Sequence, residues 1–243
     1  KTNNFISNNS KVSNFNKSII TFISLLFIYL FYLSIPTLYG KIWVQNTIED
    51  KLLKDFKINF SISSDITYNI LPTPHFLVKN SKIFRENDKG QKKISEIKKL
   101  RVFINQNNFF NKKNLNIREL LIDDANFLLQ REDLIFLNKK SDDKFSNKKI
   151  KIKKSNIFLK NDKNNETIAI IKVPNGLLYY DDLKKLNLID LQGEIFKTPF
   201  ILNYDKIFTS SKNRMIQIEA KKLKLKIFND STKTLDNQTN GIN

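Results

Sequence analysis

The sequence contains no cysteine, a single histidine and only five glycines among its 243 residues. Without cysteine there can be no disulfide, thiolate zinc site, iron–sulfur cluster or thiol catalysis. One histidine, His75, excludes a histidine-rich metal site, and so few glycines leave little material for phosphate-binding loops. Most enzyme classes with a recognisable signature are thereby excluded, and we expect a non-catalytic protein without metal or cofactor.

The chain carries 42 Lys and Arg against 24 Asp and Glu, a formal net charge of +18. A nucleic-acid-binding protein normally gathers its basic residues on one element and interleaves them with exposed aromatic residues. Here the lysines are dispersed along the chain. We interpret most of them as solvent-facing sides of the secondary structure and expect no nucleic-acid partner. Attraction to anionic lipid headgroups is the main alternative use of this charge.

Residues 18–40 contain no charged side chain, and 19–33 form an almost continuous apolar run. A helix needs about 20 residues to cross the ~30 Å hydrocarbon core of a bilayer. The segment therefore predicts a transmembrane helix over 18–40, kinked near its exit by Pro36. A cleavable signal peptide is the alternative, but its apolar region would be shorter and would end in small residues.

Lysines without acidic partners precede this segment, which favours a cytoplasmic tail over 1–17 and a main domain outside the cytoplasm. Lys17, Tyr39 and Trp43 flank the apolar run. Because lysine and aromatic side chains concentrate at membrane–water boundaries, we predict that these three residues lie at the membrane interfaces.

The spacing of apolar residues changes twice after the predicted transmembrane helix. Over 41–56 apolar residues recur at helical spacing and predict a connecting helix. Over 57–70 polar and apolar residues alternate, with Ser64 as the exception on the apolar side, and predict a single strand about 43 Å long. A proline turn at 71–74 ends this strand. The apolar side of the strand consists of Ile58, Phe60, Ile62, Ile66, Tyr68 and Ile70.

Shorter strand-like runs with polar breaks follow and have the spacing of an antiparallel meander. Several alternate plainly, as Leu100, Val102 and Ile104 do. We place the β domain at 57–229, with polar loops at 138–147 and 161–166 and a disordered tail at 230–243. The predicted runs are 76–84, 98–104, 115–122, 126–130, 134–137, 151–159, 167–173, 186–191, 200–204, 215–220 and 222–228.

This order of elements resembles the N-terminal region of the AsmA family, proteins anchored in the inner membrane of Gram-negative envelopes. The resemblance rests on the membrane and connecting helices, the alternating strand closed by Pro72-Thr73-Pro74, and a helper strand at 97–104. Residues 117–131 and the unit from Leu191 to Leu202, with its Gly and Pro-Phe, are similar to later parts of the pattern. Together they cover most of 18–228, although such proteins are usually much longer.

The resemblance implies a mainly β protein in which the two N-terminal helices precede a long, curved, mostly antiparallel sheet forming an open groove. It also implies an apolar groove face that binds or conducts phospholipid between envelope membranes, and other envelope proteins as further partners. An apolar sheet face supplies the continuous surface that acyl chains need. The groove candidates are Ile58, Phe60, Ile62, Ile66, Tyr68, Ile70, Leu100, Val102 and Ile104.

Other interpretations of the same patterns stay open. Alternating strands also form the core of an ordinary β-sandwich or of a sheet backed by helices, and the cover over the apolar face distinguishes these cases. A tethered scaffold or outer-membrane assembly factor could instead pair its sheet edge with another protein. We read His75 as a turn residue. The acidic pairs at 123–124, 142–143 and 181–182 mark loops and strand ends rather than chelating sites.

Overall fold

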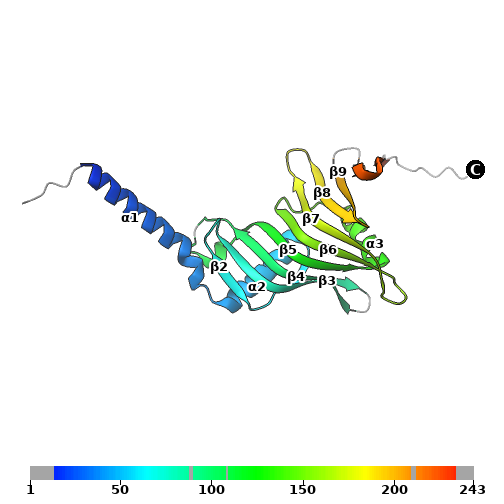
Figure 1. Cartoon of the computed structure of the whole chain (residues 1–243). Coiled ribbons are helices and arrows are strands. Elements are labelled where there is room, and N and C mark those ends of the chain that lie inside the picture. The colour runs from blue at the N-terminus through cyan, green and yellow to red at the C-terminus, as the bar shows by residue number, and fades with distance from the viewer. Residues whose placement is uncertain (1–13, 88–89, 108, 209–211, 234–243) are drawn as a thin grey trace, which may run out of the picture.

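The computed structural model describes residues 14–233 apart from 88–89, 108 and 209–211, and begins with a helix that projects from one end of the domain (Figure 1). This helix, α1 (Asn14–Ser34), ends just before Pro36, and the 3-10 turn η1 (Ile35–Leu38) follows. The window Phe15–Leu38 is long and apolar enough to span a membrane, and little of it is buried. Lys17 lies in the first turn of α1, whereas residues 1–13 of the expected cytoplasmic tail lie outside the described residues.

Helix α2 (Lys41–Phe56) follows where the sequence predicts the connecting helix, and the rest of the described chain is mainly β. A third helix, α3 (Arg131–Lys140), and two short 3-10 turns, η2 (Lys112–Asn114) and η3 (Lys221–Leu223), connect strands. The strands are β1 (Asn59–Ser61), β2 (Ile66–Asn69), β3 (His75–Asn87), β4 (Gly90–Ile104), β5 (Ile117–Leu129), β6 (Lys149–Lys160), β7 (Thr167–Asp181), β8 (Leu186–Ile195), β9 (Thr198–Ile207), β10 (Lys212–Ala220) and β11 (Leu225–Lys233).

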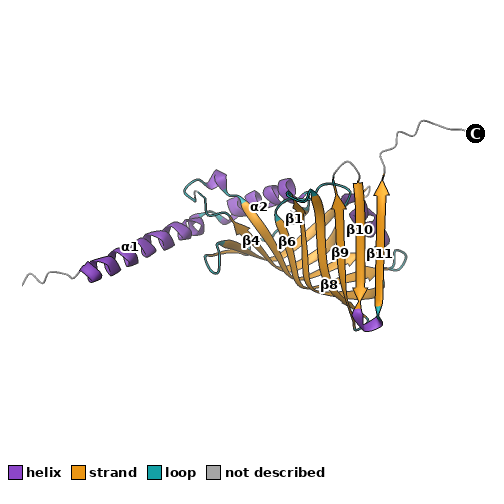
Figure 2. Cartoon of the chain, turned by 90° about the horizontal axis from the view of Figure 1, so that it is seen from above, coloured by secondary structure: helices purple, strands orange, loops and turns teal. Residues whose placement is uncertain are grey.

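All eleven strands belong to one curved sheet (Figure 2). Its order is β1-β3-β4-β5-β6-β7-β8-β9-β10-β11, and β2 pairs with β3 beside β1. Every described pair is antiparallel except β5 with β6. A parallel pair needs a crossover, which α3 and the segment after it supply. The prediction of a mainly β chain with a large, unclosed, mostly antiparallel sheet is confirmed.

The prediction of one long strand over 57–70 is wrong. The structure has two short strands, β1 and β2, both paired with β3. Between them the backbone of Ile62 bonds to α2 instead: its N–H donates to Glu49 Oε1 (2.7 Å) and its carbonyl accepts from Gln45 Nε2 (2.9 Å). Alternation therefore predicted which side chains face inward, because Phe60, Ile62 and Ile66 are all buried, but not the continuity of the strand.

Other boundaries also differ. The run 134–137, predicted as a strand, lies in α3, which starts with a capping box between Gln130 and Asp133. A four-residue apolar run is too short to show a helical or strand period, so the residues on either side determine which structure it adopts. The runs 115–122 and 126–130 are one strand, β5. Residues 222–224 precede β11, and 230–233 of the expected disordered tail belong to it; 234–243 lie outside the described residues.

A line of mostly polar residue pairs crosses five neighbouring strands, β3 to β7. It explains why the sequence pattern predicted two separate runs within the single strand β5. At each pair two successive residues lie toward the outer face, so that the inward alternation shifts by one residue. Asn80, Asp124 and Lys154 in these pairs have positive φ angles (55°, 58° and 47°), which is uncommon for residues other than glycine. The pairs are Lys79-Asn80, Lys98-Lys99, Asp123-Asp124, Lys153-Lys154 and Pro174-Asn175.

Candidate functional site

Continuous rows of mostly apolar side chains cross the inner face of the sheet, the face on which α2 packs. The strand registers place one residue of each strand opposite the next, and both rows below lie on this inner face. The first row consists of Val78, Leu100, Ile122, Ile152, Gly176, Leu191, Leu202, Ile218 and Ile227. The second consists of Phe76, Val102, Leu120, Ile150, Leu178, Ile189, Tyr204, Ile216 and Asn229.

Helix α2 covers the part of this face formed by β1 to β5. Its buried residues Val44, Ile48, Leu52 and Phe56 recur every four positions and form one apolar stripe. They belong to the same hydrophobic cluster as the inner-face residues of β3, β4 and β5. Ile48 and Leu52 are fully buried, so this part of the sheet is closed core.

The predicted groove residues lie in that closed part. Six of them are buried: Phe60, Ile62, Ile66, Leu100, Val102 and Ile104. Ile58, Tyr68 and Ile70 are partly buried against the same cluster. All nine share one face, as the alternation predicts, but α2 occupies that face. They therefore do not line an open groove, and this assignment of the groove is corrected.

The inner face of β6 to β11 is different, because most of its apolar residues remain partly exposed, although Val173, Tyr180 and Tyr204 are buried. Leu225 and Ile227 near its edge are 45% and 47% exposed. Sequence reasoning predicted most of these residues to lie in strands and noted the alternation of Leu225 and Ile227, but it did not include any of them among the groove candidates. We call the following set the uncovered inner face: Ile150, Ile152, Ile157, Ile171, Leu178, Ile189, Leu191, Leu202, Ile216, Ile218, Leu225 and Ile227. Three of these residues, Ile150, Ile152 and Ile157, also pack against the cluster under α2.

One end of the uncovered inner face is crossed by the α3 connection, residues 131–148. Asn187 on β8 holds it with three hydrogen bonds, donating to the carbonyls of Asp143 (2.7 Å) and Ser141 (3.3 Å) and accepting from the Phe145 N–H (2.8 Å). The Tyr204 hydroxyl lies 3.0 Å from Ser141 Oγ. These contacts are polar, unlike the apolar packing of α2.

Charged groups strengthen the same attachment. Lys206 and Arg214, neighbours on the inner face of β9 and β10, both donate to Asp142 Oδ1. The hydrogen bond from Lys206, together with that from Arg214, lowers the pKa of the Asp142 carboxyl below its ordinary value although burial opposes this. The carboxylate is therefore the preferred state in the folded protein.

The start of the α3 connection is fixed by Asp133, whose side chain is 1% exposed. Its Oδ1 lies 3.1 Å from Arg85 Nε, and its Oδ2 lies 2.7 Å from Lys92 Nζ and 2.9 Å from the Gln130 N–H. Arg85 is itself 7% exposed. This is a buried ion pair with a second cation, and the other acidic partner of Arg85 is the exposed Glu132 at 3.5 Å. Loss of the Asp133 carboxylate therefore leaves the buried guanidinium without its buried partner.

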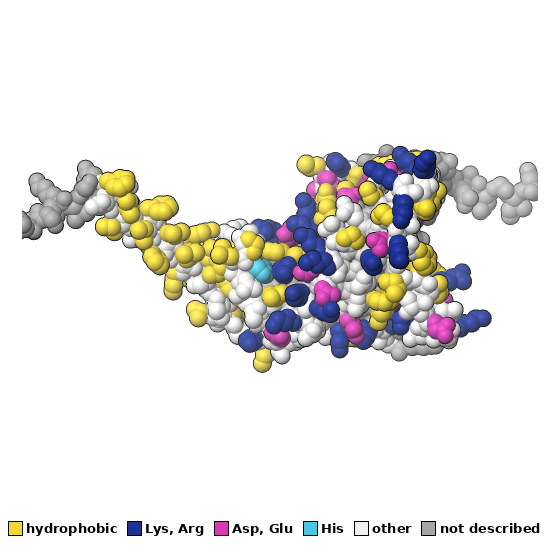
Figure 3. Space-filling model, viewed as in Figure 1, with side chains coloured by type: hydrophobic (Ala, Val, Ile, Leu, Met, Phe, Trp, Pro, Cys, Tyr) yellow, Lys and Arg dark blue, Asp and Glu magenta, His cyan; other side chains and the backbone are white. Residues whose placement is uncertain are grey.

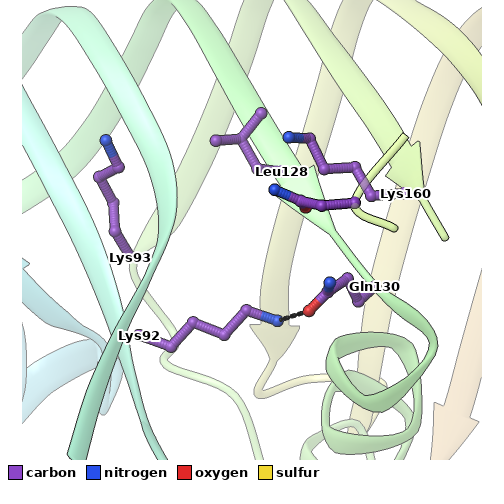
Figure 4. Close-up of a pocket in the computed structure, with 6 residues that line it drawn as sticks. Lys92, Lys93, Leu128, Gln130 and Lys160 are labelled. Carbon is purple, nitrogen blue, oxygen red and sulfur yellow. Dashed lines mark hydrogen bonds between the residues drawn. The ribbon is translucent and has the colours of Figure 1, made fainter. Parts of the chain in front are cut away.

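A small basic pocket lies beside this anchor, at the ends of β4, β5 and β6 (Figure 4). Its volume is about 160 Å³, and Lys92, Lys93 and Lys160 contribute cations. Lys92 Nζ donates to Gln130 Oε1 and to Asp133, and Lys93 pairs with Glu96. Two of the three ammonium groups are therefore already neutralised by the protein, and the pocket is best explained as part of the α3 anchor.

The outer face of the sheet is rich in lysine, although it also carries exposed apolar residues such as Ile170 and Ile201. Lys151 pairs with Glu119 on the neighbouring strand (2.9 Å), and Lys98 pairs with Asp124 (2.9 Å). Figure 3 shows Lys and Arg side chains spread over the domain rather than gathered in one patch on this side. The dispersed lysines thus lie mainly on the solvent-facing side of the strands.

Chemistry-bearing residues are sparse within the described ranges. Residues 14–233, with the stated gaps, contain no group of three His, Asp or Glu side chains placed to hold a metal ion. His75 is buried at the start of β3, with Nδ1 2.7 Å from the Thr73 carbonyl and its ring against Phe103. The acidic pair at 123–124 lies inside β5, whereas 142–143 follows α3 and 181–182 ends β7.

Of the predicted interface residues, Tyr39 and Trp43 lie together where the chain leaves α1. Their rings meet edge to face at 5.4 Å, and the Tyr39 hydroxyl donates to the Phe109 carbonyl.

No protein-family model and no curated protein matches this sequence. The case for a function therefore rests on the geometry of the molecule.

Proposed function

We propose that this protein is a non-catalytic, membrane-anchored lipid-binding protein whose uncovered inner face holds the acyl chains of a phospholipid. The observation that carries the proposal is the partial exposure of most of the apolar surface on β6 to β11, in a chain that also has a potential membrane helix. A soluble domain normally buries such a face, so large exposed apolar surfaces mark sites for apolar ligands or partners.

The energetics favour an acyl chain on this surface. Apolar burial gains ~25 cal/mol per Å², so ~400 Å² of acyl chain gains about 10 kcal/mol before the costs of binding. The interaction is non-directional, so a lipid can slide along the rows without a catalytic residue. In keeping with the resemblance to the AsmA family, we place the domain in the periplasm beside the inner membrane, where it handles phospholipid destined for another envelope membrane.

Two neighbouring residues on β9 test the proposal. Leu202 lies on the uncovered inner face, whereas Ile201 points to the outer face and is 38% exposed. Leu202→Lys places a charge among the acyl chains, and Ile201→Lys makes the same chemical change on the other side. We expect Leu202→Lys to lose most co-purified phospholipid, measured by mass spectrometry of the detergent-purified protein, and Ile201→Lys to keep it. Equal lipid content in both folded variants would contradict the proposal.

A second function is favoured by the edge strand β11. It is the last strand in the sheet order and, among the described residues, pairs only with β10, so its other edge offers free backbone hydrogen-bonding groups. A partner strand could add there by β-augmentation, as an envelope scaffold or outer-membrane assembly factor requires. A stable protein complex that contains no phospholipid would favour this function over the first.

A further inference from the structure

A second cavity lies at the other end of the molecule, beside the exit of α1. It has a volume of about 310 Å³ and lies between η1, the first turn of α2 and strand β2. Its walls are mostly apolar or aromatic, with Val44, Ile66 and Phe76 all buried. The other lining residues are Pro36, Thr37, Tyr39, Lys41, Thr67 and Tyr68.

The position of α1 fixes the level of this cavity relative to a membrane. The loop between β4 and β5 folds back along the last turns of α1, where the Tyr29 hydroxyl donates to Gln106 Oε1 (3.1 Å) and the Tyr32 hydroxyl to the Gln106 carbonyl (2.5 Å). The Tyr32 ring also stacks on Phe109 at 5.3 Å. Pro36 and Thr37 in the cavity wall belong to the apolar window of α1. The cavity thus lies at the end of this apolar window, where a membrane-spanning α1 would leave the hydrocarbon.

The surface around the cavity is strongly apolar at this end. Leu38, Ile42, Leu71 and Phe110 are 73–78% exposed and come from four segments that meet around the end of α1. The turn that carries Leu71 is tied to this end by the hydrogen bond from the Ile104 N–H to the Pro74 carbonyl (3.2 Å). Figure 3 shows the hydrophobic surface of α1 continuing onto the adjoining end of the domain. Such side chains are favourable in contact with a bilayer and costly in water.

The polar groups of the cavity fit an anion. Lys41 is exposed at its rim, Thr37 and Thr67 contribute hydroxyls, and no acidic residue lines it. Lys112 adds a second cation nearby, with Nζ 5.5 Å from the centre of the Tyr39 ring. Among lipids, an anionic phospholipid offers a phosphate for the cations at the same depth as glycerol and acyl groups for the apolar walls.

We propose that this cavity binds the headgroup of an anionic phospholipid drawn from the bilayer that α1 spans. The lipid's acyl chains extend along the exposed apolar surface at Leu38 and Ile42. This site lies at the membrane end, away from the uncovered inner face, so either binding site can exist without the other. A lipid held here also fixes the orientation of the domain on the membrane.

The test compares two lysines on the same helix. Lys41→Glu reverses the charge at the rim of the cavity, and Lys54→Glu makes the same change on an exposed position near the other end of α2. The full chain, with the photocrosslinking residue p-benzoylphenylalanine in place of the exposed apolar residue Leu38 beside the cavity, is placed in nanodiscs of phosphatidylcholine with or without phosphatidylglycerol. The crosslinked lipid is then identified by mass spectrometry.

We expect crosslinking to phosphatidylglycerol in preference to phosphatidylcholine, a loss of about fivefold or more in Lys41→Glu, and no loss in Lys54→Glu or Lys41→Arg. Equal crosslinking of the two lipids, or equal loss in both glutamate variants, would overturn the proposal. Displacement of the lipid by millimolar inorganic phosphate would show that the cavity recognises free phosphate instead. The phospholipid that co-purifies with Lys41→Glu is measured by mass spectrometry, as for the Leu202 variant. If this lipid is retained while crosslinking at the cavity is lost, the cavity result is independent of the proposed function.

Discussion

The two parts of the inner sheet face have the same alternating residue pattern but differ in how far their apolar side chains are buried. On β1 to β5 the apolar residues are buried under α2, whose stripe of Val44, Ile48, Leu52 and Phe56 completes the core. On β6 to β11 most of the corresponding residues stay partly exposed, and the α3 connection crosses one end through polar and charged contacts. An alternating strand therefore specifies an apolar face, while the element that packs on that face determines whether it is buried core or stays partly exposed.

The manner of attachment sharpens this difference. Packing of α2 removes apolar surface from water on both partners, so the helix and the sheet stabilise each other. The α3 connection contributes little apolar packing, since Leu134, Ile135 and Leu137 of α3 are themselves exposed. It is held instead at its ends, by Asp133 and by the contacts of residues 141–145. Such a crossing segment can be stable without closing the surface beneath it.

The largest effect is expected at Asp133, the buried anchor of the α3 connection. Asp133→Ala leaves the buried Arg85 with only the longer pair to the exposed Glu132 (3.5 Å) and should lower the free energy of unfolding by about 3–5 kcal/mol. Urea unfolding of the detergent-purified protein measures this loss. Glu194→Ala, which removes the exposed pair with Lys172 (3.0 Å), is the control and should cost about 1 kcal/mol or less. Similar losses in the two variants would show that the anchor is not buried.

The next prediction compares the two parts of the face directly. Ile48→Ala removes side-chain volume from the fully buried contact of α2 with the sheet and should cost about 2–5 kcal/mol. Ile189→Ala makes the same change on the uncovered inner face and should cost about 1 kcal/mol or less, because part of that side chain already contacts water. The same unfolding measurement applies. Equal costs would mean that the second part of the face is covered in solution.

A close contact on the uncovered part gives a smaller effect. Gly193 on β8 lies opposite Phe200 on β9, and a Cβ atom at position 193 would come within 2.6 Å of Phe200 Cε1. Gly193→Ala must therefore displace the ring and should cost about 1–3 kcal/mol. Phe200→Leu in the same chain should recover part of that loss, because the shorter side chain leaves the space free. Additive costs in a double-mutant cycle would argue against the contact.

The sequence contained much of this fold but not the division of the face. Alternation correctly placed Phe60, Ile62 and Ile66 on one side, yet it could not show that the backbone at Ile62 bonds to α2 rather than to β3. The helical spacing of apolar residues predicted the stripe of α2, and such an apolar helix face is normally buried against another element. That requirement was the available signal that the first strands were core. The signal for the uncovered part was absent, because burial depends on contacts between segments far apart in the chain.

The smallest expected effects are changes in the free energy of unfolding with pH. They have opposite signs for Asp142, which contacts the inner face of β9 and β10, and for Asp205 on the outer face of β9. The bonds from Lys206 and Arg214 lower the pKa of Asp142, so its carboxylate stabilises the folded state above the ordinary carboxyl pKa and loses this contribution as the pH falls. Burial, together with the nearby charge of Asp190, raises the pKa of Asp205. The ionised form of that residue therefore costs stability at neutral pH, and the cost disappears on acidification.

Two amide substitutions separate these signs. At pH 7, Asp142→Asn should lower the free energy of unfolding and Asp205→Asn should raise it, each by about 1 kcal/mol or less because both carboxyls retain contact with water. Both differences from the unsubstituted protein should shrink towards pH 3. The raised pKa of Asp205 lets its difference disappear first, whereas the lowered pKa of Asp142 means that its difference is lost only gradually below the ordinary carboxyl pKa. Unfolding curves at the two pH values measure them. A stabilising Asp142→Asn would contradict the polar attachment of the α3 connection, because removal of that carboxylate would then have relieved strain instead of breaking a contact.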